Sequence, residues 1–433
     1  MSRGLVRPCR GRVGSAGRAL APGLSHLGEN SRMDLSAATT KLQALRRDMN
    51  GHTDRTDERR ILDLLEGATG EELNFLLANV DLVRLLSDLD DRLLGPDHRT
   101  ALLELLCARR AAELSLPVRA SLATALQKGA TRAKAEARLR DLFLGLKGRE
   151  LTAFKNLLDA GGDSHDLHHL VFDDVDDPAV REALLTHFQR EAAASPSGEN
   201  KVLSDIDDTF FRNWVDPRYP PKTVYPGVLA FYQELDRGPG IIPGRAGDLV
   251  FVSARPRDPL GLIENATLES LRERGVPLSV MLSGSFFHLV GNTRIAQKKF
   301  ENFEQYARLF PEYGFVFVGD SGQGDVEFGA RMRATHPQAV RAVFIHDVVA
   351  TPRPVRDEWR ARHLFFFDTY VGAAVEAFHA GVISRDGVDR IAAAASEALA
   401  AIAFPSPARR HEREAELAHD LARAQALPRA SAV

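Results

Sequence analysis

The spacing of hydrophobic residues divides the chain into a helical part and a part with alternating strands and helices. Across residues 34–194, glycine and proline are infrequent and leucine recurs at helical spacing. A weak repeat relates LLEGATGEELNFLL at 64–77 to LFLGLKGRELTAFKNLL at 142–158, roughly 80 residues later. This pattern predicts a helical bundle of two related halves, and it does not say what the bundle binds.

After residue 196 the pattern changes to short apolar runs separated by helical segments, which is typical of a parallel α/β sheet. Several of these runs end in a polar or acidic residue, and ligands of such sheets bind at the carboxyl ends of the strands. The predicted strands are Val202–Ile206, Leu249–Ser253, Ser279–Leu282, Phe315–Val318, Ala342–His346 and Leu364–Phe367.

These patterns predict four parts of the chain. Residues 1–33 are rich in Arg, Gly, Ala and Ser, and we expect a disordered transit peptide or a non-native extension. Residues 34–195 form an all-helical domain, and residues 196–385 form the α/β domain. Residues 386–433 supply C-terminal helices and a tail.

Composition excludes some classes of protein. The 433 residues are 44% hydrophobic and 27% charged with a net charge of −3, so nothing global indicates nucleic-acid binding. Cys9 and Cys107 cannot build a disulfide framework, which favours a reducing, cytoplasmic location. No apolar run approaches the ~20 residues that span a bilayer, so a lipid substrate would be reached from the membrane surface.

The most informative stretch is the first predicted strand with its exit, KVLSDIDDT at 201–209. Residues two apart in an extended chain point the same way, so Asp205 and Asp207 would face one spot. Two such carboxylates require a cation between them, most simply Mg²⁺. One carboxylate can attack phosphorus while the other moves a proton. The alternative is an acidic turn after a strand.

Further candidate residues follow the second and third strands. Ser253 can donate a hydrogen bond to a phosphate oxygen, and Arg255 can bind a phosphate with two nitrogens. Gly284 and Ser285 follow the third strand. Taken alone, the stretch with Ser253 and Arg255 is about equally consistent with an ordinary turn.

Lys299 lies four residues before Phe303, on the predicted buried stripe of its helix, whereas Lys298 points to solvent. A buried lysine needs an anion, which a carboxylate cluster and a phosphoryl group would supply. After the fourth strand, Asp320 and Asp325 flank a glycine-rich turn, GDSGQGD. Asp320 at the strand tip suits direct metal ligation, and Asp325 suits a supporting role or a bond to Lys299.

The order of these motifs on alternating strands resembles the haloacid dehalogenase superfamily, and within it the App1-like phosphatidate phosphatase catalytic domain. The likeness extends from Lys201 to about Ser384, and it leaves residues 34–195 without an assignment. The motifs that carry it are DIDDT at 205–209, VYPG at 224–227, VSARP at 252–256, Gly284-Ser285, Lys299 with Phe310-Pro311, GDSGQGD at 319–325 and FFDTY at 366–370.

The resemblance implies a parallel, doubly wound, Rossmann-like sheet and a Mg²⁺-dependent phosphatase. It implies that Asp205 is the nucleophile and that Asp207 protonates the leaving alcohol and then activates water. By the same likeness, Ser253 and Lys299 hold the phosphoryl oxygens, with Thr209, Arg255, Gly284 and Ser285 as further substrate contacts. Asp205, Asp207 and Asp320 would hold the metal, with Asp325 in support.

The segment between Thr209 and the second strand is too short for a full cap domain, so the site is expected to be open and to suit a large substrate. Phosphatidate or a related lipid phosphate is the substrate that the resemblance implies. Two alternatives stand beside it. One is a phosphatase for another phosphomonoester, such as a nucleic-acid end or a protein. The other is a binding protein whose helical domain contacts a membrane or a partner.

Overall fold

The structure is a computed structural model that describes residues 33–49, 51, 53–89, 96–128, 133–160, 166–239, 249–256, 262–276, 280–284 and 292–429. Its centre is a six-stranded sheet in the order β3-β2-β1-β4-β5-β6, in which all neighbouring strands are parallel. The strands are β1 Asn200–Ser204, β2 Leu249–Pro256, β3 Val280–Gly284, β4 Gly314–Asp320, β5 Val340–His346 and β6 Leu364–Phe367. The structure therefore confirms the mixed α/β class and all six predicted strands.

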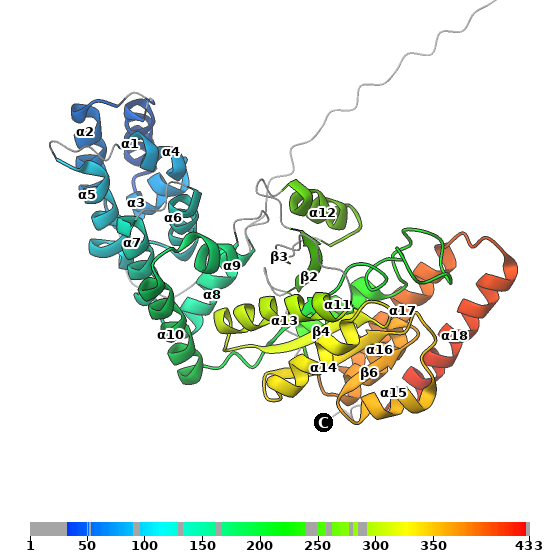
Figure 1. The fold of residues 1–433 in the computed structure, drawn as a ribbon. Coiled ribbons are helices and arrows are strands. Elements are labelled where there is room, and N and C mark those ends of the chain that lie inside the picture. Colours follow the sequence, from blue (N-terminus) through cyan, green and yellow to red (C-terminus); the bar gives the residue numbers. More distant parts are fainter. Residues whose placement is uncertain are drawn as a thin grey trace, which may run out of the picture.

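Helices cover both faces of the sheet, so alternate residues of one strand enter different cores (Figure 1). Val202 belongs to the core shared with α11, α16 and α17, whereas Leu203 belongs to the core shared with α13 and α14. Burial on both faces explains why the central strands read as continuous apolar runs. The helices of this part are α11 Val228–Arg237, α12 Leu262–Glu273, α13 Asn292–Leu309, α14 Asp325–Thr335, α15 Arg353–Arg360, α16 Tyr370–His379, α17 Arg385–Ala401 and α18 Pro407–Gln425.

The described part of residues 33–194 is helical and forms an arm beside the sheet (Figure 1). Aspartates or Thr69 cap several of its helices through backbone N–H groups, which fixes where those helices begin. Its elements are α1 Leu35–Asp48, α2 Arg55–Glu66, α3 Gly70–Ala78, α4 Leu82–Asp88, α5 His98–Glu104, η1 Leu105–Arg109, η2 Ala111–Glu113, α6 Leu116–Lys128, α7 Ala133–Leu144, α8 Gly148–Asp159, α9 Leu167–His169, η3 Leu170–Asp174 and α10 Pro178–Ala194. In the described part of the chain, no helix is both long and apolar enough to cross a bilayer.

Buried charges join this helical arm to the sheet. Lys201 of β1 is fully buried, and its Nζ lies 3.0 Å from Asn156 Oδ1 and 3.7 Å from Asp159 Oδ2, both on α8. Beside it, Lys155 Nζ lies 2.8 Å from the Glu312 carboxylate. Burial lowers the pKa of Lys155 to about 8, against the opposing effect of Glu312. Buried, paired charges therefore hold α8 against β1, the strand that leads to Asp205.

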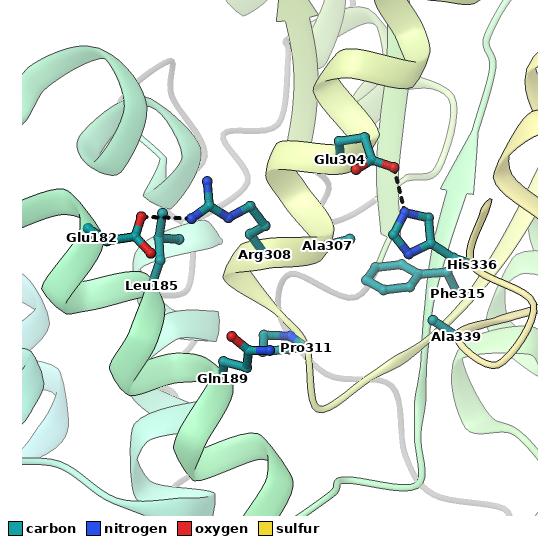
Figure 2. Close-up of a pocket in the computed structure, with 10 residues that line it drawn as sticks. All are labelled: Glu182, Leu185, Gln189, Glu304, Ala307, Arg308, Pro311, Phe315, His336 and Ala339. Carbon is teal, nitrogen blue, oxygen red and sulfur yellow. Dashed lines mark hydrogen bonds and ion pairs between the residues drawn. The ribbon is translucent and has the colours of Figure 1, made fainter. Parts of the chain in front are cut away.

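A cavity of about 360 Å³ lies further along the same seam, between α10 and α13. Figure 2 shows its rim, where Glu182 of α10 pairs with Arg308 of α13 and Glu304 pairs with His336. Phe315, near the amino end of β4, lines this cavity. The cavity thus lies toward the opposite edge of the sheet from the residues that follow the strands.

Candidate active site

Three acidic residues meet where two central strands end. Asp205 follows β1, Asp320 ends β4, and Asp325 begins α14. Ser204 pairs with Val318 in the parallel register, and the Asp205 amide donates to the Val318 carbonyl at 2.9 Å. Neighbouring strands therefore bring together carboxylates that are more than a hundred residues apart in the sequence.

Lys299 binds two of these carboxylates from α13. Its Nζ lies 2.7 Å from Asp205 Oδ1 and 2.7 Å from Asp325 Oδ1, and its side chain is buried. Burial alone would lower the pKa of Lys299, but Asp205 and then Asp325 outweigh it and raise that pKa. Lys298 instead pairs with Glu301 near the surface. The structure thus places Lys299, and not Lys298, beside the predicted nucleophile.

The cluster carries more negative than positive charge. One oxygen each of Asp205, Asp320 and Asp325 can lie within 4.8 Å of the others, and Lys299 is the lysine that contacts them. Burial, with a further contribution from Asp325, raises the pKa of Asp205 to about 7 against the effect of Lys299. Burial and then the neighbouring Asp325 and Asp205 raise the pKa of Asp320 well above its ordinary value. Like charges this close favour a bound cation.

The remaining carboxylate oxygens show where such a cation fits. Asp205 Oδ2 and Asp320 Oδ2 are buried and have no hydrogen-bond partner among the described residues. Both oxygens of Asp325 are engaged, since Oδ1 accepts from Lys299 and Oδ2 accepts from the Asp320 amide at 3.2 Å. Buried carboxylate oxygens without a partner suit a hard divalent ion, and Asp205 and Asp320 each offer one, whereas both oxygens of Asp325 already accept hydrogen bonds.

Glycines allow the loop after β4 to approach this cluster. A Cβ at Gly319 would lie 2.6 Å from Asp325 Oδ2 and 2.7 Å from the Phe317 ring, so no side chain fits there. Gly324 precedes α14 with φ at +83°, a conformation that favours glycine. Gly322 donates its amide to Asp320 Oδ1 at 2.6 Å. The glycine spacing therefore follows from the close packing of Asp320 and Asp325.

The loop after Asp205 is held from several sides. Asp207 is half-buried, and its Oδ1 accepts from Asn213 Nδ2 at 2.7 Å. The Thr209 carbonyl accepts from the Tyr370 hydroxyl at 2.6 Å, while the Thr209 hydroxyl is buried without a partner in the described part of the chain. The sequence assigns no role to Asn213 and includes Tyr370 only within the FFDTY motif, because both reach this loop through contacts that spacing along the chain does not show.

A neutral histidine lies beneath this loop. His346 Nδ1 lies 2.9 Å from the Asp208 carbonyl and Nε2 lies 3.2 Å from Arg218 Nη2, so the first nitrogen donates and the second accepts. Burial, and then the charge of Arg218, lowers the pKa of His346 to about 4. Asp216 binds Arg218 with both oxygens, at 2.8 and 2.9 Å. The imidazole therefore supports the loop as an uncharged group.

Four predicted substrate contacts lie on or after β2 and β3. Ser253 and Arg255 lie in β2 and Gly284 ends β3, so their backbones reach the same edge of the sheet as Asp205. The side chains of Ser253 and Arg255, and the whole of Ser285, lie outside the described residues. Their contacts with a phosphate therefore remain predictions.

Comparison with known proteins identifies a family for this part of the chain. Residues 200–347 match the family described as phosphatidate phosphatase APP1, catalytic domain. The matched segment contains Asp205, Asp207, Lys299, Asp320 and Asp325. No curated protein and no solved structure matches the chain. The family match confirms the predicted resemblance and the predicted enzyme class, a phosphatidate phosphatase among the phosphoric monoester hydrolases.

Proposed function

We propose that this chain hydrolyses phosphatidate or a related lipid phosphate through an aspartyl-phosphate on Asp205, with Mg²⁺ as cofactor. In this proposal residues 196–385 are a haloacid dehalogenase-type domain with a doubly wound sheet and no large cap. The observation that supports it best is Lys299, which bonds to Asp205 and Asp325 beside two unpartnered carboxylate oxygens at the carboxyl ends of β1 and β4. An amine and a carboxylate cluster of this kind suit the transfer of an anionic phosphoryl group.

The chain's own residues account for the chemical steps. A carboxylate oxygen of Asp205 attacks phosphorus while the bond from phosphorus to the leaving alcohol breaks, and Asp207 gives its proton to that alcohol oxygen. Asp207 then takes a proton from water as the water oxygen attacks phosphorus and Asp205 departs as a carboxylate. Lys299 holds Asp205 in place and, with Ser253, balances the phosphoryl charge.

For the metal ligands, the proposal combines the acidic cluster with the role that the resemblance implies for Asp207. Asp205, Asp320 and the Asp207 backbone carbonyl would hold Mg²⁺, while Asp325 orients Lys299 and the Asp320 backbone. When bound, the ion supplies charge neutralisation that lets a carboxylate approach a phosphate. Thr209, Arg255, Gly284 and Ser285 would complete the phosphate contacts.

Exposed apolar side chains on two loops support contact with a membrane surface. Trp214 is 71% exposed, Val215 is 37% exposed and Val349 is 50% exposed. Val215 packs on the loop after β4, since a Cβ at Gly322 would lie 3.2 Å from it, and the Val348 amide donates to Ser321 in that same loop. Val215 and the segment that carries Val349 therefore both border the loop between Asp320 and Asp325. An exposed tryptophan is typical of proteins that rest on the lipid interface.

The experiment measures phosphate release from phosphatidate in vesicles and from p-nitrophenyl phosphate, with Mg²⁺ and with EDTA. We expect Asp205→Asn and EDTA each to abolish turnover of both substrates. We expect Trp214→Ala to lower activity on vesicles alone, whereas Val355→Ala, which truncates an exposed apolar side chain on α15, should leave both activities unchanged. Activity retained by Asp205→Asn would refute the assignment of Asp205 as the nucleophile. Turnover of the aryl phosphate alone would support a phosphatase activity and refute a lipid phosphate as the substrate.

A further inference from the structure

A short hairpin after Thr209 folds back over the catalytic loop. Phe211 pairs with Val224 in an antiparallel bridge, the Arg212 amide donates to the Thr223 carbonyl at 2.9 Å, and the Lys222 amide donates to the Arg212 carbonyl at 2.9 Å. We call residues 211–224 the flap. Phe211 also forms a parallel bridge with Asp207, so the flap begins beside the loop that carries Asp207.

The side chain of Asn213 points from the flap to Asp207. Its Nδ2 lies 2.7 Å from Asp207 Oδ1, and Lys222 Nζ donates to Asn213 Oδ1. An ammonium group can only donate, so its partner must be the amide oxygen and the amide nitrogen must face Asp207. The flap thus gives Asp207 a hydrogen-bond donor in one orientation.

Asp208 fixes the flap to the loop that carries Asp207. Its buried carboxylate accepts from the backbone amides of Asn213 at 2.8 Å, Trp214 at 2.9 Å and Val215 at 2.6 Å. Asp208 has φ at +58°, which is uncommon for a residue other than glycine and turns its carboxylate into the flap. Three amides on one carboxylate make a rigid connection, so Asn213 is held where it can orient its neighbour.

We propose that Asn213 is a positioning residue that orients the proton-transferring carboxyl of Asp207, and that Lys222 in turn orients Asn213. The inference rests on the proposed function, since it assumes that Asp207 protonates the leaving oxygen. The hydrogen bond from Asn213 to one oxygen of Asp207 restrains rotation of the carboxyl group about its Cβ–Cγ bond. Removing that contact should slow the step in which the proton moves, while the attack by Asp205 remains intact.

This expectation separates positioning from general structural damage. A poor leaving group such as an alkoxide needs the proton, whereas a nitrophenolate leaves with little help. We therefore compare kcat/KM for dioctanoyl phosphatidate and for p-nitrophenyl phosphate. Asn213→Ala should lose about 10- to 100-fold on the alkyl ester and less than about 3-fold on the aryl ester, since small misplacements of a catalytic group cost up to ~10².

Reference variants make the result decisive. Asp207→Asn should also lose more kcat/KM on the alkyl ester than on the aryl ester, and by a larger factor than Asn213→Ala. Lys222→Met should show the same preference by a smaller factor, which gives a second measurement if Asn213→Ala folds poorly. Thr223→Ala, whose interaction in the flap is through its backbone carbonyl, is the matched control and should retain both activities. Equal losses of Asn213→Ala on both substrates, or none on the alkyl ester, would overturn the inference. If Asp205→Asn stays active, the proposed function fails instead.

Discussion

Lys201 offers the sharpest test of how the helical arm supports the catalytic strand. Lys201→Met leaves the Asp159 carboxylate buried after its neighbouring ammonium, 3.7 Å away, has been removed. At an effective dielectric constant of ~20, two charges at that distance interact with about 4.5 kcal/mol. Loss of one partner from a buried pair costs about 3–5 kcal/mol in practice. We therefore expect the free energy of unfolding to fall by about 4 kcal/mol.

The assay is urea unfolding followed by far-ultraviolet circular dichroism and by tryptophan fluorescence. A second variant, Lys201→Met with Asp159→Asn, removes both charges but keeps an acceptor for the Tyr306 hydroxyl, which lies 2.5 Å from Asp159 Oδ2. This double variant should recover to within ~1 kcal/mol of wild type.

An exposed pair at the same seam provides the control. Arg308 and Glu182 pair at 2.9 Å, but their side chains are 51% and 66% exposed, so Arg308→Met should cost less than about 1 kcal/mol. The reasoning would be refuted if Lys201→Met cost as little as Arg308→Met. It would also be refuted if the double variant were no more stable than the single one.

Three further predictions concern the metal, pH and the glycine loop. Without substrate, Mg²⁺ at ~100 times its dissociation constant should raise the free energy of unfolding by about 2.7 kcal/mol. This should be measured as a rise in Tm on addition of Mg²⁺, and the rise should be absent in Asp320→Asn. The folded pKa of His346 is about 4 against an ordinary 6.5, so the unfolded chain binds the proton first and stability is lost as pH falls between these values, by about 3 kcal/mol. In urea unfolding measured at several pH values, His346→Gln should make the free energy of unfolding vary less with pH in this range. An unchanged slope of that free energy against pH would contradict the prediction. Gly319→Ala should displace the Asp325 carboxylate and lower kcat at least ~10-fold, while the helix-end variant Gly145→Ala should retain wild-type kcat.

Local periodicity explains why much of the sheet could be predicted from the sequence. The six apolar runs are short and bounded by polar residues, and all six are strands. Lys299 could be placed on the buried side of its helix because it lies one turn before Phe303, and both side chains are buried. These inferences need only the spacing of neighbours along one element.

Contacts between distant segments could not be predicted in this way. Lys201 is the second residue of β1, and nothing in the local pattern marks it as buried; it is buried because α8 packs over it. Asn213 reaches Asp207 because the flap pairs Phe211 with Val224, a register that the prolines of this segment do not reveal. Both depend on tertiary packing, which a single sequence does not encode in a readable pattern.

The hydroxyl of Tyr370 bears on how short an active fragment of this enzyme can be. The family match ends at residue 347, yet Tyr370 donates to the carbonyl of Thr209 in the catalytic loop from α16. A fragment trimmed to the matched borders would lack this tether, and also α16, one of the helices that cover one face of the sheet. Any minimal catalytic unit for expression or crystallisation must therefore extend through α16.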